Sequence, residues 1–367
     1  MVTLAEVAQH AGVSASTVSY VLSGKRSISA NTRRRVEESI RRLGYHPNAG
    51  ARALASSRSN VIALMIPLRT DMYVPVMMEI AIAVTTTARA HGYDVLLLTG
   101  EEGPDAVRRV AGSGLADGMI LMDVELDDER LPLLRGGGAP AHGGPPARAD
   151  SRVGEDSRVG EDSRVGDDQS AVLIGLPADT TGLTCVDLDF RAAGALCVEH
   201  LAALGHRDIA VVGEAPAVYE RHTGFAERTL DGLRSQARES GVRLLHRPCE
   251  GGYAAMAVTL ARILDERPGT TAFVVQNESA VEPLLALLRQ QGRAVPEDVS
   301  VVAICPEQVA VQASVRLTSV AIPAQEMGRY AVEHLVAKLD GRGDDEVVLL
   351  APELTVRASS GPAPARA

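Results

Sequence analysis

The sequence predicts an α/β protein with a small helical N-terminal domain. Three helices in a helix-turn-helix arrangement and a hinge helix precede two doubly wound parallel-sheet subdomains. Three observations support this fold class. The 367 residues exceed the roughly 250–300 residues at which a single hydrophobic core stops growing. Basic residues concentrate near the N-terminus, and from residue 60 onward apolar runs alternate with amphipathic segments, which is typical of parallel sheets covered by helices.

The composition excludes several classes of protein. With 46% hydrophobic and 23% charged residues the chain resembles ordinary globular proteins, and no apolar run reaches the roughly 18 residues that a membrane span needs. The N-terminus lacks a basic flank and a long apolar core, so we expect no secretory signal, no membrane partner and a cytoplasmic protein. The four cysteines lie far apart, without histidines at metal-ligand spacing, so we expect no disulfide, metal or cofactor.

The net charge of −10 hides a strong asymmetry between the two ends of the chain. Residues 1–60 contain nine Lys or Arg and three Glu, a net charge of +6, whereas the rest of the chain carries −16. Such an asymmetry predicts a basic nucleic-acid module attached to an acidic sensing or catalytic body.

The first domain shows the start and stop signals of three helices. Thr3 and Glu6 form a capping-box pattern, and Gly12 breaks the first helix shortly before a second one begins after Ser14. A third helix ends at Gly44, with apolar residues on one face and arginines mostly on the other. Two helices across a tight turn predict a unit whose second helix enters the major groove of DNA.

Specific strings distinguish this unit from the alternative, a small three-helix domain with a solvated basic face. Residues 3–8 (TLAEVA), 11–14 (AGVS) and 17–22 (TVSYVL) together resemble the signature of the lac repressor family of bacterial transcription regulators. Residues 45–48 (YHPN) and 51–54 (ARAL) resemble the hinge helix of that family.

The resemblance implies a set of DNA contacts. On the second helix, the base-reading positions are Ala15, Ser16 and Tyr20. The phosphate contacts or supporting residues are Ser14, Thr17, Ser19, Thr32 and Tyr45. The hinge positions are Asn48, Ala51 and Leu54, where Leu54 is either an apolar wedge inserted into the minor groove or an ordinary core leucine.

The body shows regular alternation of strands and helices. The predicted strands cover residues 61–67, 93–99, 119–122, 172–174, 209–213, 272–276 and 299–303. The predicted helices cover residues 74–90, 104–112, 192–204, 223–240 and 279–291. Ligands of such folds bind beyond the carboxyl ends of the strands, so the residues that follow each strand are candidate contacts.

The resemblance also implies that the body is built like periplasmic sugar-binding proteins and holds an effector between its subdomains. Residues 221–225 (RHTGF) match the R-x-x-G-aromatic motif of the family. Arg221 is therefore the first candidate, because a guanidinium fork binds two vicinal hydroxyls; the alternative is a surface arginine at a helix start. The other candidates are Asp71, Tyr73, Phe190, Tyr219, Asn277 and Glu278, and the aromatic ones are equally compatible with a core position.

Two departures from the family pattern bear on the effector. Residues 303–306 (AICP) stand where the family has Gly-aromatic-Asp-Asp, and residues 277–278 (NE) stand where it has Asn-Asp. The loss of an aspartate argues against a simple monosaccharide. Residues 70–77 (TDMYVPVM), together with residues 305–306 (CP), resemble the cellobiose-responsive repressors of cellulose utilisation within this family.

The resemblance and the composition together define the predicted domains. The DNA-binding domain covers residues 1–46, the hinge helix and linker 47–59, and the effector-binding and dimerisation domain 60–367. Three near copies of SRVGED lie in a stretch rich in Gly, Pro, Ala and Asp, residues 136–170, which predicts a flexible insertion; a calcium-binding repeat is the functional alternative. We expect a disordered tail from about residue 357, and a homodimer because the tail has no apolar heptads.

The sequence therefore predicts a regulator and not an enzyme, with no catalytic residue. The predicted protein is a homodimer that binds a pseudopalindromic double-stranded DNA operator, represses sugar-utilisation genes and is released by a small-molecule effector, such as the oligosaccharide cellobiose. A repressor of the same family that responds to a non-sugar metabolite is the alternative. An enzyme or sugar carrier on this scaffold is disfavoured, because the sequence has no G-x-S-x-G elbow, P-loop or H-E-x-x-H motif.

Overall fold

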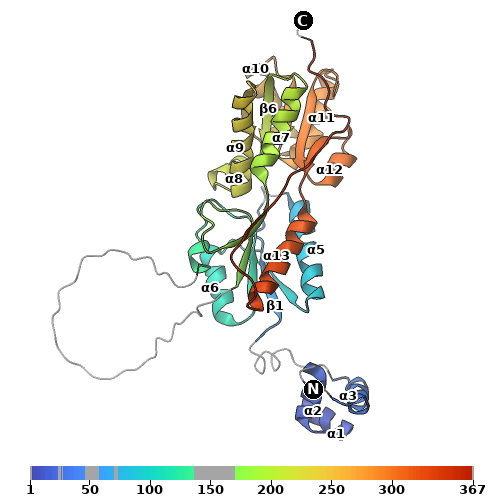
Figure 1. Cartoon of the computed structure of the whole chain (residues 1–367). Coiled ribbons are helices and arrows are strands. Elements are labelled where there is room, and N and C mark those ends of the chain that lie inside the picture. Colours follow the sequence, from blue (N-terminus) through green and yellow to red (C-terminus); the bar gives the residue numbers. More distant parts are fainter. Residues whose placement is uncertain are drawn as a thin grey trace, which may run out of the picture. The chain divides into compact units, whose positions relative to one another are not determined.

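The computed structural model describes residues 2–23, 26, 28–45, 58–69, 73–135 and 170–365. The chain divides into two compact units, Met1–Asn60 and Val61–Ala367, which we describe separately (Figure 1). Four predicted contacts, namely Asn48, Ala51, Leu54 and Asp71, lie outside the described residues, as do most of the predicted hinge and nearly all of the predicted insertion.

Three helices pack around a small apolar core in the first unit. They are α1 (Leu4–Ala11), α2 (Ala15–Ser23) and α3 (Ala30–Leu43). The capping box is present, since Thr3 Oγ1 accepts from the N–H of Glu6 (3.3 Å) and the Glu6 carboxylate accepts from the N–H of Thr3 (2.7 Å). The buried core residues are Val7, Ala8, Ala11, Val18, Val21, Val36 and Tyr45.

The turn between α1 and α2 requires glycine. Gly12 ends α1 with a φ of 61°, in the left-handed region that other residues rarely adopt. Arg35 on α3 contacts this turn, and its Nη2 donates to the carbonyl oxygens of Ala11 (2.5 Å) and Gly12 (3.3 Å). A Cβ atom at position 12 would lie 2.8 Å from that nitrogen, so a side chain there would displace the end of Arg35 and disturb the contact that ties the turn to α3.

The first sheet of the body has the strand order β11-β5-β4-β3-β1-β2, and every pair is parallel. Its strands are β1 (Val61–Met65), β2 (Asp94–Leu98), β3 (Gly118–Leu121), β4 (Ala171–Ile174), β5 (Thr184–Leu188) and β11 (Val347–Leu350). Ile62 and Leu64 pack on one side, against α5 (Val74–Ala90) and α13 (Ala324–Leu339). Ala63 and Met65 face the other side and pack against α6 (Gly103–Ser113).

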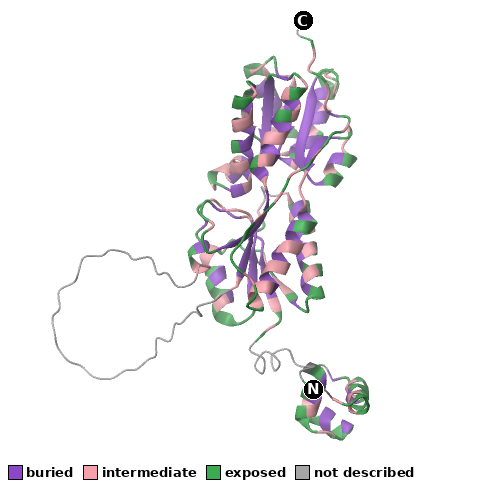
Figure 2. Ribbon diagram, viewed as in Figure 1, coloured by how far each residue is buried: buried purple, intermediate pink, exposed green. Residues whose placement is uncertain are grey.

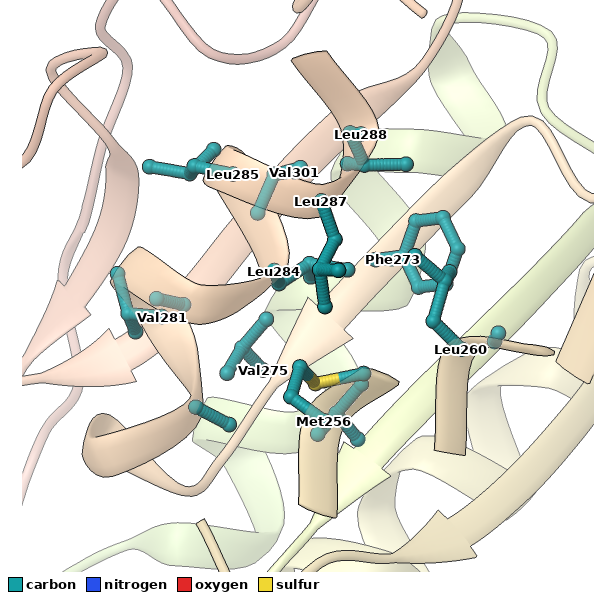
Figure 3. Packing of buried hydrophobic residues seen from close by; sticks show 14 of the residues in the cluster. Met256, Leu260, Phe273, Val275, Val281, Leu284, Leu285, Leu287, Leu288 and Val301 are labelled. Atoms are coloured by element: carbon teal, nitrogen blue, oxygen red, sulfur yellow. The ribbon is translucent and has the colours of Figure 1, made fainter. Parts of the chain in front are cut away.

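The second sheet has the order β12-β10-β9-β8-β6-β7, parallel except for the short edge strand β12. Its strands are β6 (Asp208–Gly213), β7 (Arg243–Pro248), β8 (Ala272–Val275), β9 (Ser300–Cys305), β10 (Thr318–Ala321) and β12 (Leu354–Thr355). One face packs on α10 (Gly252–Glu266) and α11 (Val281–Gln290), with Phe273, Val275 and Met256 at the contact (Figure 3). The other face packs on α7 (Phe190–Ala203) and α9 (Gly224–Glu239).

This topology confirms the predicted α/β class, with two parallel-rich sheets each covered on both faces. The central strands are buried, as the purple arrows in Figure 2 show. The chain passes between the sheets three times, after β5, after β10 and after β11. Both subdomains are therefore assembled from segments far apart in the sequence, and their relative position depends on three short connections.

Every predicted element of the body overlaps an observed one, and α5 has the predicted bounds. The prediction omitted several elements, including β5, β7, α10 and everything after β9. Two omissions have a physical reason. The string TCVDL of β5 places a carboxylate within the strand, and RLLHRP of β7 carries the charges of an edge strand, so neither has a clean apolar pattern.

The predicted disordered tail is wrong for its first half. Ser359 is fully buried, accepts from the N–H of Thr318 (2.8 Å) and donates to the carbonyl oxygen of Val301 (2.5 Å). Arg357 donates two hydrogen bonds to the carboxylate of Glu307 (2.6 and 2.7 Å). The small polar residues that suggest disorder serve here to satisfy buried backbone groups of the second sheet.

Helices α7 and α9 approach closely because each carries a glycine at the contact. A Cβ atom at Gly232 would lie 1.9 Å from the carbonyl oxygen of Arg191, and one at Gly194 would lie 2.4 Å from that of Thr229. Both neighbours are backbone atoms, so the helices would have to separate to admit a side chain.

We expect Gly232→Ala to lower the free energy of unfolding by about 1–3 kcal/mol, because the helices must move apart. Gly112 in α6 is the matched control, since nothing lies within 4 Å of a Cβ atom there. Gly112→Ala should hold or raise stability by up to about 1 kcal/mol, the usual gain of alanine over glycine in a helix. Urea unfolding followed by circular dichroism measures the stability of both variants. Equal changes in the free energy of unfolding would contradict the close approach of α7 and α9.

Candidate nucleic-acid interface and ligand pocket

The start of α2 presents a cluster of hydroxyl groups. Ser14 Oγ caps the helix by accepting from the N–H of Thr17 (3.2 Å), and it lies 2.8 Å from both Ser16 Oγ and Thr17 Oγ1. Ala15, Ser16 and Ser19 are exposed, whereas Val18 is buried in the core. The predicted base-reading face of α2 therefore points away from the domain core, with hydrogen-bonding groups at the end of the helix that enters a groove in helix-turn-helix proteins.

Three other predicted DNA contacts, Tyr20, Thr32 and Tyr45, are half-buried or buried. Tyr20 is half-buried, and the guanidinium of Arg26 lies 5.7 Å from its ring centroid. Thr32 is half-buried in the first turn of α3, where its Oγ1 accepts from Ser29 Oγ (2.8 Å). Tyr45 is only 8% exposed and belongs to the apolar core of the first unit.

The surface of the first unit is basic. The exposed arginines include Arg34, Arg41 and Arg42 on α3. Arg34 donates to the Asn31 side chain (3.2 Å), while Arg41 and Arg42 lie in the last turn of the helix. Guanidinium groups of this kind supply sequence-independent affinity for phosphates.

A pocket that is partly open to solvent lies between the two sheets of the body. Several lining residues lie just beyond strands of both sheets: Asp123 is two residues after β3, and Gly175, Glu214 and Gln276 directly follow β4, β6 and β8. The carboxyl ends of both sheets therefore meet at one pocket, as expected for ligand sites of doubly wound folds.

Much of the pocket wall is apolar and aromatic. Tyr73 lines it immediately before α5, and Phe190 lines it at the start of α7. The rings of Phe190 and Phe225 are 5.5 Å apart and tilted by 50°. Burial, followed by the negative charge of Glu278, raises the pKa of the Tyr73 hydroxyl, so that it stays protonated.

Charged groups lie between these apolar surfaces. Asp187 at the end of β5 is buried and forms an ion pair with Arg228 on α9. Burial raises the pKa of Asp187 to about 6 although the guanidinium contact lowers it. Asp123 forms an ion pair with Arg69, and Arg221 lies with its Nε 3.9 Å from Glu125 Oε1. Burial also raises the pKa of Glu278, to about 8, so this carboxyl group is largely protonated near neutral pH.

The structure brings together four of the predicted effector contacts. Tyr73, Phe190, Arg221 and Glu278 all line the pocket. The side chains of Tyr219 and Asn277 lie behind the lining instead. The Tyr219 hydroxyl bonds to Gln276 Oε1 (3.0 Å), and Asn277 Nδ2 donates to the carbonyl oxygen of Cys249 (2.7 Å).

Sequence reasoning missed several lining residues. Asp123 follows a predicted strand, so the rule that selected Tyr73 would have found it. Asp187 lies in β5, which was not predicted, and nothing in the sequence pairs it with Arg228. Gln276 was taken as the last residue of a strand and was therefore not inspected.

One short backbone connection joins the two subdomains beside the pocket. Glu125 and Thr223 form an isolated antiparallel bridge. The N–H of Leu126 donates to the carbonyl oxygen of His222 (2.9 Å), and the N–H of Gly224 donates to that of Val124 (2.9 Å). The residue after Arg221 therefore belongs to a backbone contact with the other subdomain, which places this ligand candidate beside a link between the two.

Two features of the described residues bear on other functions, namely the length of their helices and the grouping of metal-binding side chains. In the described ranges, no helix is long and apolar enough to cross a membrane. Over the same part of the chain, no group of three or more His, Cys, Asp or Glu side chains is arranged to hold a metal ion.

Comparisons with known proteins agree with this architecture. Residues 3–48 match the family described as bacterial regulatory proteins, lacI family, and residues 198–360 match the periplasmic binding protein-like domain. The HTH-type transcriptional regulator CelR of Thermobifida fusca is 30% identical, over 97% of this chain and 98% of that protein. Catabolite control protein A of Priestia megaterium is 24% identical over 96% of each chain.

Solved structures give the same result. A transcriptional regulator CelR-cellobiose complex superposes with a TM-score of 0.64 at 25% identity, covering 98% of this chain and 100% of that one. A lac repressor dimer bound to operator and the anti-inducer ONPF has a TM-score of 0.78 at 22% identity, with 98% and 99% covered, and shares the fold. The predicted resemblance is confirmed, and the chain belongs to the lacI family of bacterial regulatory proteins, DNA-binding regulators of transcription.

Proposed function

We propose that the protein is a repressor that binds an operator through α2 and releases it when a neutral oligosaccharide, such as cellobiose, enters the pocket of the body. One observation carries this proposal: residues at the carboxyl ends of both sheets line a single pocket. A ligand that contacts both subdomains stabilises one relative arrangement of them, which is the requirement for an allosteric signal.

On the DNA side, the proposal assigns roles to the exposed face of α2. Ala15, Ser16 and Tyr20 read base edges, while the hydroxyls of Ser14, Thr17, Ser19 and Thr32 contact phosphates and fix the register. Tyr45 supports the domain from its core. We retain Asn48, Ala51 and Leu54 as hinge contacts, with Leu54 as the wedge in the minor groove.

On the ligand side, the pocket combines groups suited to a sugar. Aromatic rings such as Tyr73 and Phe190 pack against the apolar C–H faces of a pyranose, and Arg221 binds hydroxyl oxygens. Asp71 remains a proposed contact. The choice of cellobiose as the probe comes from the solved complex of the relative CelR, which is 25% identical over nearly the whole of this chain. A non-sugar metabolite is the alternative ligand.

We propose that the protein acts as a homodimer on a pseudopalindrome. Helix α5 carries an exposed apolar stripe at helical spacing, formed by Val74, Met78 and Ile82, which are 44–59% exposed. A second copy that covers this stripe would shield it from water, and the resulting dimer would carry two α2 helices for the two half-sites of a pseudopalindrome. In this proposal the pocket binds its ligand without transforming it, and the protein acts in the cytoplasm, where its operator is located.

The coupling between ligand and DNA needs only modest energy. An allosteric coupling of about 1–3 kcal/mol changes operator affinity roughly 5- to 150-fold. The bridge between Glu125 and Thr223 and the three chain crossings are the connections through which the two subdomains of the body change their relative position.

A gel-shift titration tests the whole proposal. The full chain should bind a pseudopalindromic fragment from upstream of its own or neighbouring genes, with an affinity that falls steeply as salt increases. Cellobiose should release the fragment, whereas sucrose serves as the control sugar. If the protein shows no salt-sensitive, palindrome-specific binding, the repressor function is wrong. If a metabolite releases the fragment but no sugar does, only the choice of effector is wrong.

Arg221→Lys should weaken cellobiose binding roughly 10- to 100-fold, because a lysine cannot bind two oxygens at once. Isothermal titration calorimetry measures the change. Arg108→Lys is the matched control, since Arg108 is exposed on α6 and pairs with Asp105 far from the pocket lining. Equal affinities of the two variants would show that Arg221 is a surface arginine.

The stability of the protein should depend on the charge of Glu278. Its pKa is about 8 in the folded protein and near the ordinary value of 4.5 when unfolded, so the folded state holds an extra proton between these values. The free energy of unfolding should therefore fall as the pH rises from about 5 to 8. Glu278→Gln should reduce that fall, while Glu297→Gln, at an exposed position, should not. Denaturant unfolding at pH 5, 7 and 9 measures these free energies. If the wild type and Glu278→Gln lose the same stability over this pH range, the raised pKa of Glu278 is contradicted.

A further inference from the structure

One polar group in the ligand pocket is unexplained by the structure of the protein itself. Gln276, directly after β8, is 3% exposed and lines the pocket. Its Oε1 accepts from the Tyr219 hydroxyl (3.0 Å), but its Nε2 is buried and has no hydrogen-bond partner among the described residues. Nearly all buried polar groups in proteins are hydrogen-bonded, so such an amide requires a reason.

The neighbouring residue shows what a purely structural amide looks like here. Asn277 is also buried, and both ends of its side chain are bonded: Nδ2 donates to the carbonyl oxygen of Cys249 (2.7 Å), and Oδ1 accepts from the N–H of Ser279 (2.9 Å). Asn277 fixes the turn after β8 and does not line the pocket. Gln276 lines it and leaves two N–H donors unused.

A hydrogen-bonded chain behind the pocket holds the amide of Gln276 in place. The Tyr219 hydroxyl, which donates to Oε1, accepts from the N–H of Glu214 (3.2 Å) and lies 3.1 Å from His246 Nε2. Burial lowers the pKa of His246 to about 4, so the ring is neutral and can present an N–H to the hydroxyl. Each group then has a partner, except the Gln276 amide nitrogen.

The hydrogen bonds behind the pocket indicate which end of the amide faces it. The Tyr219 hydroxyl accepts from the N–H of Glu214, so its own proton is available to Gln276 Oε1 and Nε2 is left without a partner. Four carboxyl groups, those of Asp123, Asp187, Glu214 and Glu278, line the same pocket together with Arg221. The pocket therefore offers many acceptors and, at this point, a buried pair of donors.

We propose that Gln276 is a ligand contact whose Nε2 donates to an oxygen of the bound effector, and that Tyr219 and His246 are its positioning residues. The inference rests on the proposed sugar-responsive function and adds a chemical requirement. The effector presents a neutral acceptor oxygen, such as a hydroxyl, ring or glycosidic oxygen, at the end of β8.

Calorimetric titration of the full-length protein with cellobiose tests the contact. Gln276→Met keeps the length of the side chain and removes both donors, so the dissociation constant should rise at least tenfold. Gln290→Met is the matched control: Gln290 also accepts from a tyrosine hydroxyl, that of Tyr253 (2.7 Å), but it is exposed and does not line the pocket. The control should bind cellobiose like the wild type.

A double-mutant cycle tests the positioning role of Tyr219. Tyr219→Phe alone should weaken cellobiose binding, because the amide is then free to turn. In the presence of Gln276→Met the same change should have little further effect, since no donor remains to be positioned. A merely structural tyrosine would weaken binding equally in both backgrounds, and that result would overturn its positioning role.

A measurement without ligand separates this inference from the proposed function. Gln276→Met should leave the thermal unfolding midpoint unchanged or raise it when it is made in the Tyr219→Phe background, where no tyrosine hydroxyl loses its acceptor and the change removes a buried donor that has no partner. A lowered midpoint together with unchanged cellobiose affinity would overturn the proposal. If the wild type binds no cellobiose, only the sugar-responsive function is wrong, and the thermal unfolding midpoint still tests the role of Gln276. A lowered midpoint shows that the amide stabilises the protein itself. An unchanged or raised midpoint supports an amide that is available to a ligand.

Discussion

The architecture of the body depends on one constraint, the parallel direction of its strands. Parallel strands place all their carboxyl ends at one edge of a sheet, and helices on both faces leave that edge uncovered. Here the edges of two such sheets meet at one pocket, and the chain crosses between the sheets three times beside it. The pocket and the connections that allow the subdomains to move are thus consequences of the same topology.

The pocket contains charged groups that a hydrophobic core would reject. Asp187 is buried against Arg228, and Asp123 against Arg69, so ion pairing offsets part of the cost of removing these carboxylates from water. Burial raises the pKa of Glu278, which forms no such ion pair among the described residues. Buried charged groups destabilise the folded state but supply hydrogen-bonding groups, and such a combination is typical of a binding site.

The first unit and the body divide the charge of the chain between two tasks. A net charge of +6 in residues 1–60 supplies affinity for DNA phosphates, while the −16 of the remainder disfavours contact between the body and DNA. The small unit is folded by one apolar core and by Arg35, which ties the helical turn to α3. Because Val18 anchors α2 from the inside, the hydroxyl-bearing side of that helix is left for recognition.

The sequence by itself determined the fold class, the three N-terminal helices and part of the pocket, because capping residues, periodicity and residues after strands are local signals. Positions after strands and the family motif selected Tyr73, Arg221 and Glu278, and the short list of aromatic residues added Phe190; all four line the pocket. Only the tertiary structure showed that Tyr219 and Asn277 lie behind the lining, that Arg228 neutralises Asp187, and that residues 357–363 are ordered. Each of these depends on contacts between residues far apart along the chain, such as Asn277 with Cys249, Asp187 with Arg228 and Thr318 with Ser359. Periodicity and spacing carry no information about such pairs, since they describe only neighbours along the chain.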